Sequence, residues 1–176
     1  MESGGFALTV LFAAIFTNNI LLTNFLGMCS FLAVSKEIKT SLGLGFAVIF
    51  VMACTSVLNY LIYYFILEPL DLTYLRFIVF IVVIAAFVQL VEMIIERVSE
   101  TLYAALGIFL PLITVNCAIL GASLFMIIRE YDLLSSFTYG LGSGIGWFLA
   151  ILAMAGIRQK IAKARIPRGL EGAGIT

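Results

Sequence analysis

Apolar residues gather into five long stretches along the chain, separated by short polar connections such as KEIKT, EPLDLT, ERVSE and REYD. A helix needs about 20 apolar residues to cross roughly 30 Å of hydrocarbon, so each stretch is long enough to span a membrane. Backbone groups in lipid must be paired within their own segment, which favours helices, and the alternating pattern of a membrane barrel is absent. The predicted spans cover approximately residues 6–35, 42–67, 72–95, 102–128 and 133–157.

The composition agrees with a chain whose main solvent is lipid. Of the 176 residues, 63% are hydrophobic and 11% are charged, whereas soluble domains average about 45–50% and 25%. Because no linker or low-complexity segment divides the sequence, we predict an all-α integral membrane protein with a single transmembrane domain over residues 1–176. The opening residues MESGGFALTVLFAAIF lack a basic region, so we expect no cleaved signal peptide.

The distribution of basic residues predicts the orientation. If the N-terminus lies outside, the inner connections and the C-terminal tail carry eight of the ten basic residues, and the outer connections carry only Arg76 and Arg129. Cytoplasmic loops are enriched in Lys and Arg, so we predict an outside N-terminus and a cytoplasmic basic tail, RQKIAKARIPR. This rule explains the tail better than a nucleic-acid patch does, and the net charge of zero gives no indication of a nucleic-acid partner.

A cysteine motif occurs twice. Residues 25–35 read FLGMCSFLAVS and residues 113–123 read ITVNCAILGAS, so both contain Cys-x-x-Leu-(Ala or Gly)-x-Ser. The following helices also match, SLGLGFAVIF against YGLGSGIGWF. The two halves begin an odd number of spans apart and therefore enter the membrane from opposite sides, which is typical of an inverted-topology repeat. Chance similarity between apolar sequences is the alternative.

The repeat predicts three-helix units, at about residues 6–95 and at about residues 102–176. The second unit is incomplete, because only two of its spans are visible. The final residues GLEGAGIT resemble the opening of another span. We therefore expect either a sixth helix that is truncated in this chain or a protein that has lost this helix.

The first and fourth spans are predicted to be interrupted helices, each with a cysteine just after the interruption. Proline removes a backbone hydrogen bond, and polar side chains can pair with the freed groups. Broken helices at matching positions of two halves indicate a central site, and the alternative is a pair of gently kinked helices. The residues expected to interrupt the helices and line the site are Asn18, Asn19, Asn24 and Gly27, followed by Pro111, Thr114 and Asn116.

Cys29 and Cys117 occupy equivalent repeat positions, so we expect them to converge near the bilayer centre, whereas Cys54 is expected only to pack. The pair has three possible uses: inert packing, a disulfide, or thiolate ligation of a soft metal. Iron and iron–sulfur centres usually take four thiolates. With two cysteines and no histidine, a complete site would need a second, similar subunit.

Four stretches, FLGMCSFLAVSK, LGIFLPLITVNCAI, YGLGSGIGWFLAI and AGIR, closely resemble the paired membrane subunits of two related complexes. These are the sodium-translocating NADH:quinone reductase and the Rnf ferredoxin:NAD oxidoreductase. The resemblance covers essentially the whole chain. GMCSFLAVSK and GSGIGW are most similar to the E-type subunit of the quinone reductase, whereas the short LEPLDLTYLRF turn is more similar to the A-type subunit of Rnf.

The resemblance implies that Cys29 and Cys117 supply half of an intramembrane iron or [2Fe-2S] centre. An inverted sister subunit, the D-type subunit of the quinone reductase or the E-type subunit of Rnf, would supply the other two thiolates. The chain would relay electrons within an ion-translocating oxidoreductase of a bacterial or archaeal inner membrane, with no independent catalysis. FMN, riboflavin, FAD, a cytoplasmic [2Fe-2S] domain and the NADH or ferredoxin sites would belong to other subunits. The family has six spans, so a missing sixth helix would be a departure from it.

Glu92 is the carboxylate that stands out, because ionisable residues within spans are functional suspects by default. By resemblance, its position is linked to sodium uptake from the cytoplasm, and Gln89 could assist. The alternative is a carboxylate at a helix end that reaches the interface, with Arg97 as its ion-pair partner. Two other classes of function also stay open: a small inverted-repeat secondary transporter and a purely structural scaffold of a membrane complex.

Overall fold

The computed structural model describes residues 2–36, 38–98 and 110–163, and helices account for all regular structure in these ranges. π-Helical and 3₁₀ segments extend or precede several of the α-helices. The elements in chain order are α1 (Glu2–Phe12), η1 (Ala13–Thr17), α2 (Ile20–Asn24), α3 (Met28–Val34), α4 (Ile38–Ile62), η2 (Tyr63–Leu67), η3 (Thr73–Leu75), α5 (Arg76–Val98), α7 (Leu110–Thr114), α8 (Cys117–Ile128) and α9 (Leu133–Lys163).

By length and composition, four helices in the described ranges can cross a membrane: Ile38–Leu67, Thr73–Arg97, Pro111–Ile128 and Leu133–Ile161. The prediction of five long spans is therefore not confirmed. The first predicted segment is divided, and its longest apolar helix, Gly5–Thr17, is shorter than a span. The sixth helix expected from the repeat falls outside the described residues, and the inverted repeat itself stays a prediction.

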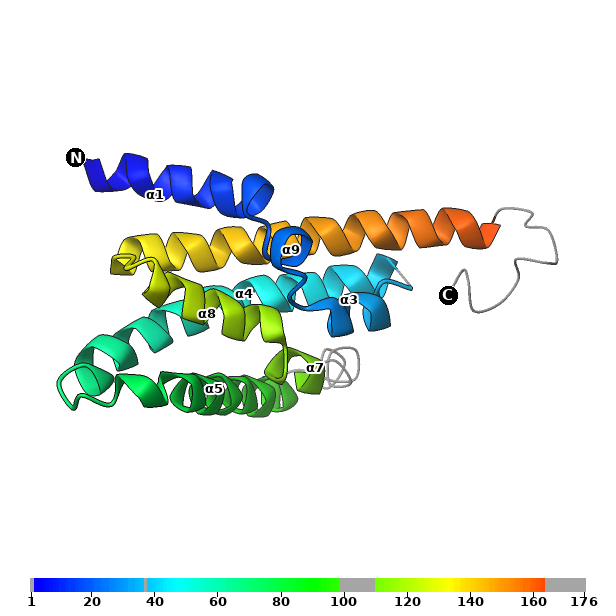
Figure 1. The fold of residues 1–176 in the computed structure, drawn as a ribbon. Coiled ribbons are helices and arrows are strands. Elements are labelled where there is room, and N and C mark those ends of the chain that lie inside the picture. Colours follow the sequence, from blue (N-terminus) through cyan, green and yellow to red (C-terminus); the bar gives the residue numbers. More distant parts are fainter. Residues whose placement is uncertain (1, 37, 99–109, 164–176) are drawn as a thin grey trace.

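The centre of the molecule is the pair of helices α4 and α9, which lie side by side along most of their length (Figure 1). Glycines allow this close approach. A methyl group on Gly144 of α9 would lie 2.9 Å from the Cα of Ile49, and one on Gly45 of α4 would collide with the Phe148 ring. Small residues at helix contacts are typical of membrane bundles, where close van der Waals packing replaces the hydrophobic effect.

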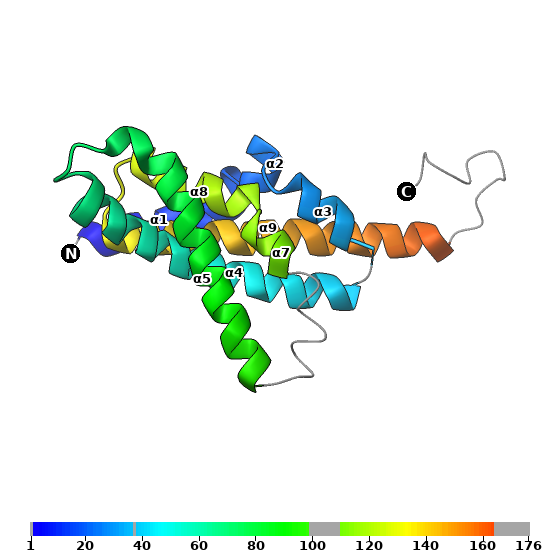
Figure 2. The same ribbon diagram turned by 90° about the horizontal axis from the view of Figure 1, so that it is seen from below.

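The other helices surround this pair unequally. α1 and η1 run along α9, and α8 packs against α4. α5 diverges from the bundle (Figure 2). Only 17% of the most apolar 18-residue stretch of Thr73–Arg97 is buried, compared with 50% for that of Ile38–Leu67. The exposed side chains of α5 are largely apolar, so this helix presents a surface suited to lipid or to another membrane protein.

The two ends of the bundle differ in their polar contacts. At one end, the Arg158 guanidinium donates to the carbonyl oxygen of Leu32 at 3.0 Å, which ties α9 to α3. At the other end, Arg129 lies over the Tyr139 ring at 5.5 Å and donates to the Tyr131 hydroxyl at 3.3 Å. This hydrogen bond raises the pKa of Arg129. Aromatic rings with a basic partner are typical of a membrane–water interface.

Candidate functional site

The first interruption begins at Asn18 and Asn19, where the helix formed by α1 and η1 ends. Asn19 caps α2, since its Oδ1 accepts hydrogen bonds from the backbone N–H groups of Leu21 at 3.1 Å and Leu22 at 3.4 Å. Its Nδ2 donates to the carbonyl oxygen of Gly146 at 2.8 Å, 127 positions away. The amide therefore replaces the backbone partners lost at the break and fixes the break against α9.

The same segment is interrupted a second time between α2 and α3, where the backbone turns through left-handed conformations. Phe25 has a φ of 54° and Gly27 a φ of 84°. Glycine adopts such a conformation without steric cost. Gly27 is also buried, and a methyl group at this position would lie 2.6 Å from Trp147 Nε1 and 3.1 Å from Ala118 Cβ. Both the backbone angle and the space therefore require glycine.

The fourth predicted segment is interrupted between α7 and α8. α7 contains Pro111 in its first turn, where the missing N–H is tolerated, and it ends at Thr114. Asn116 is the N-cap of α8, and its side chain accepts from the backbone N–H of Ala118 at 3.0 Å. The break expected here from sequence is present, and its asparagine is buried in the same capping role as Asn19.

The two interruptions meet at Cys117. The backbone N–H of Gly27 donates to Cys117 Sγ at 2.9 Å, although the two residues are 90 positions apart. Cys117 is the first residue of α8. Cys29 is the second residue of α3, two positions after Gly27. The structure therefore brings Gly27, Asn116 and Cys117 together, with Cys29 on the adjoining turn.

Several apolar side chains at the two interruptions are exposed. Cys29 is exposed, whereas Cys117 is half-buried. Phe25 is 69% exposed and Val115 is 72% exposed, and Leu32 on the next turn of α3 is exposed as well. Asn24, also predicted to line the site, is exposed and donates to the neighbouring Thr23 hydroxyl at 3.1 Å. A thiol on such a face is accessible to a partner within the membrane.

The donor set is sufficient for half of a tetrathiolate centre. Across residues 2–36, 38–98 and 110–163, no three His, Cys, Asp or Glu side chains lie close enough to hold a metal ion. The third cysteine, Cys54, lies within α4 and is partly buried. A four-cysteine site built on Cys29 and Cys117 thus needs two further thiolates from another chain.

Two buried donors beside this cluster fit an acceptor of negative charge. Asn116 Nδ2 and Trp147 Nε1 have no hydrogen-bond partner among the described residues. Trp147 is 0% exposed and Asn116 is 2% exposed. Buried oxygens of Ser35, Asn59 and Ser143 also lack partners among the described residues. Asn116 and Trp147 differ from these because they lie against Gly27, which donates to the cysteine sulfur, so their free N–H groups are compatible with a thiolate-bound group. Sequence reasoning missed Trp147, although the glycine-rich GSGIGW stretch of the predicted repeat contains it.

Glu92 and Gln89 lie near the end of α5 and not at the cysteine cluster. Glu92 is half-buried and Gln89 is exposed. Within the described part of the chain, no hydrogen bond or ion pair joins either side chain to the cluster or to Arg97. The contacts of α5 with α7 and α8 are the link between this region and the second interruption.

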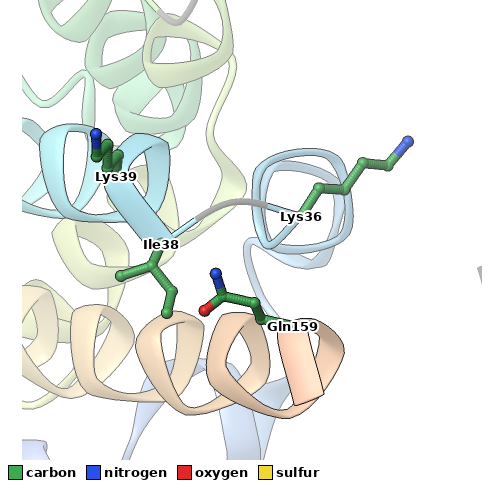
Figure 3. A pocket seen from close by; sticks show the side chains of 4 residues that line it. All are labelled: Lys36, Ile38, Lys39 and Gln159. Atoms are coloured by element: carbon green, nitrogen blue, oxygen red, sulfur yellow. The ribbon is translucent and has the colours of Figure 1, made fainter. Parts of the chain in front are cut away.

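A hollow of about 370 Å³ lies near the end of α9, lined by Lys36, Ile38, Lys39 and Gln159 (Figure 3). The side chains of Lys36 and Lys39 extend away from each other, so their charges do not converge on the hollow. Such diverging lysines are typical of a basic helix end that faces water, whereas an anion-binding site would need converging charges. The arrangement does place several basic residues at one end of the bundle.

Comparison with known proteins extends these observations. Residues 7–176 match the family model described as "Rnf-Nqr subunit, membrane protein". A protein of Psychromonas ingrahamii is 52% identical over 179 residues, which cover 96% of this chain and 89% of the relative. A protein of Aeromonas salmonicida is 54% identical over 175 residues, which cover 96% of this chain and 88% of the relative. Both relatives are named as the E subunit of Na(+)-translocating NADH-quinone reductase.

Proposed function

The chain belongs to the Rnf-Nqr family of membrane subunits, and from this premise we propose that it relays electrons within a redox-driven sodium pump. Its relatives are subunits of an oxidoreductase complex, which supports a role as part of an enzyme complex with no catalysis of its own. The two relatives named above support the quinone reductase branch over the A-type subunit of Rnf. The proposed complex is therefore a sodium-translocating NADH:quinone reductase.

The observation that carries this proposal is the meeting of the two helix interruptions at Cys117. The Gly27 N–H donates to Cys117 Sγ at 2.9 Å, and Cys29 lies on the adjoining turn. Iron centres are held by cysteine thiolates, and hydrogen bonds to the cysteine sulfurs are a regular part of such sites. Cys29 and Cys117 would hold half of an iron or [2Fe-2S] centre. When bound, such a centre accepts and returns single electrons.

The remaining thiolates would come from an inverted sister subunit, the D-type subunit of the complex. Phe25 at the first break and Val115 at the second are exposed, so the two interruptions present apolar side chains that a second membrane protein can cover. FMN, riboflavin, FAD, a [2Fe-2S] domain and the NADH site are assigned to other subunits. The chain itself would fix its two thiolates, keep bulk water away with the buried α4–α9 pair, and contact lipid on its outer faces.

The basic residues at one end of the bundle support the orientation that we propose. Lys36 and Lys39 lie close to Gln159 at one end, and Arg158 is tied to α3 there. We assign this basic end to the cytoplasm and the N-terminus to the outside of a bacterial or archaeal inner membrane. A secondary transporter is disfavoured because residues 6–35 and 110–128, which contain the interruptions, include no charged residue, whereas ion transporters usually keep one near the membrane midplane.

The proposal is tested by measuring iron and the EPR signal in the purified complex and in a preparation that lacks the sister subunit. A shared centre requires both subunits, so we expect the signal and the iron of this site only in the complete complex. Unchanged iron without the sister subunit would exclude a shared site. Electron transfer without any iron at this site would favour a structural scaffold instead.

Glu92 is proposed to take part in sodium uptake on the cytoplasmic side. We expect Glu92→Gln to raise the sodium concentration needed for half-maximal turnover roughly tenfold, equivalent to about 1.4 kcal/mol. The physical reason is the loss of a half-buried negative charge. Iron content should not change. Glu96→Gln, at an exposed position one turn further along α5, is the matched control, and an equal shift in both variants would assign the effect to general surface charge.

A further inference from the structure

We propose that Gly27, Asn116 and Trp147 form a hydrogen-bond donor pocket that raises the reduction potential of the thiolate centre. The inference rests on the proposed function, because it assigns these groups a role toward a centre bound at Cys117. Its basis is one existing hydrogen bond to the Cys117 sulfur and two buried donors beside it that lack partners among the described residues. These residues would be positioning groups that contribute no ligand of their own.

Asn116 and Trp147 both lie against Gly27, the residue that donates to the cysteine sulfur. The Gly27 N–H already donates to Cys117 Sγ at 2.9 Å. The position of a Cβ atom on Gly27 lies 2.6 Å from Trp147 Nε1 and 3.2 Å from Asn116 Oδ1. Asn116 immediately precedes Cys117 in the chain. The donors therefore come from three elements, the α2–α3 connection, the start of α8 and the middle of α9.

The orientation of the Asn116 amide supports its assignment as a donor. Its Oδ1 accepts from the Ala118 N–H at 3.0 Å, so the oxygen is occupied by the capping bond of α8. The Nδ2 group on the other side of the amide is buried and has no partner among the described residues. The same holds for the Trp147 indole N–H, which is fully buried on the adjacent helix.

Burial makes these donors costly unless an acceptor is present. An unpaired polar group in an apolar interior loses its hydration without compensation. A thiolate-bound iron centre is a natural acceptor, because its cysteine sulfurs carry negative charge and accept N–H donors. Reduction adds a further negative charge, so donors stabilise the reduced form more than the oxidised form. The pocket would therefore raise the reduction potential, and removing a donor should lower it.

The test uses Trp147→Phe in the complete purified complex, because phenylalanine keeps an aromatic ring and removes the N–H. We expect a roughly tenfold shift of the equilibrium toward the oxidised centre, which is about 59 mV for one electron. EPR-monitored redox titration measures this shift, and iron analysis checks that the centre is retained. Asn116→Ser, which keeps a side-chain oxygen for the cap, should shift the potential in the same direction.

Tyr139→Phe is the matched control, because it also removes one polar hydrogen from a buried aromatic side chain of α9, two turns away. The reduction potential of the centre in this variant should equal that of the wild type. Wild-type potentials in both Trp147→Phe and Asn116→Ser, with full iron content, would overturn the donor pocket and leave the proposed function intact. Loss of iron from an assembled Trp147→Phe complex would also overturn it, because the indole would then hold the centre and not tune it. A wild-type complex without iron at this site would refute the proposed function itself.

Discussion

Replacing Cys29 or Cys117 with alanine is expected to remove the proposed intramembrane iron centre from the purified complex completely. Each change removes one of the two thiolates that this chain can offer at the interruptions, and a centre that needs four thiolates cannot be completed by the remaining ligands. Electron transfer through the complex should fall at least about 100-fold, because loss of metal ligation abolishes the relay. Iron analysis and the EPR spectrum measure the first effect, and quinone reduction measures the second.

The matched control for this experiment is Cys54→Ala. Cys54 is a free, partly buried cysteine within α4, so its replacement tests the removal of a thiol that is not at an interruption. We expect full iron content and wild-type electron transfer in this variant. If Cys29→Ala retained as much iron as Cys54→Ala, Cys29 would be excluded as a ligand. The half-site on this chain would then have to be sought elsewhere.

Hydrophobicity alone predicted the long spans well. The predicted segments 42–67, 72–95 and 133–157 correspond to Ile38–Leu67, Thr73–Arg97 and Leu133–Ile161. This agreement has a simple cause. A helix that crosses the hydrocarbon needs about 20 apolar residues, so the apolar run itself shows where the helix lies. Contacts with other helices are not needed for this prediction.

The first segment shows where such reasoning stops. Its polar residues predicted an interruption, but the number and position of the breaks depend on contacts distant in sequence. The Asn19 side chain donates to the Gly146 carbonyl oxygen on α9. Trp147 lies so close to residue 27 that only glycine fits there. These partners lie in the other half of the chain, so no local pattern could reveal them.

Only part of the candidate site could be predicted from the sequence. Repeat positions identified Cys117, and the predicted interruptions identified Gly27 and Asn116, which the structure brings together with it. Trp147 was missed because a lone tryptophan in an apolar helix usually only packs. Its importance becomes visible only when its N–H is found buried without a partner in the described part of the chain. Glu92 was identified from its charge, a property that carries no information about its distance from the cysteines.

Gly27→Ala is expected to destabilise the chain and disturb the centre. The alanine methyl group would lie 2.6 Å from Trp147 Nε1, which is well inside van der Waals contact. Overpacking of a buried position costs about 1–3 kcal/mol. The left-handed backbone at φ 84° adds about 1–2 kcal/mol for a residue that has a Cβ atom. The unfolding midpoint of the purified complex in detergent should therefore fall, and its iron content should fall with it.

Gly156→Ala provides the control, because a methyl group there meets nothing within 4 Å and the residue lies in the regular helix α9. Alanine in a helix is favoured over glycine by about 1 kcal/mol, so this variant should be as stable as the wild type or slightly more stable. Equal destabilisation by the two changes would contradict the close contact at Gly27.

Combining Gly27→Ala with Trp147→Phe separates the two causes of the destabilisation. The smaller phenylalanine ring removes the nearest atom that the new methyl group meets, so it should recover part of the overpacking cost, while the contacts with Ala118 and Asn116 and the cost of the backbone conformation remain. Residues in direct contact show interaction energies of about 0.5–3 kcal/mol in such double-mutant cycles, whereas independent sites are additive. We therefore expect the double variant to be more stable than the sum of the single changes predicts. Strict additivity in thermal unfolding would mean that the indole does not contact Gly27, and the alignment of donors around Cys117 would lose its geometric basis.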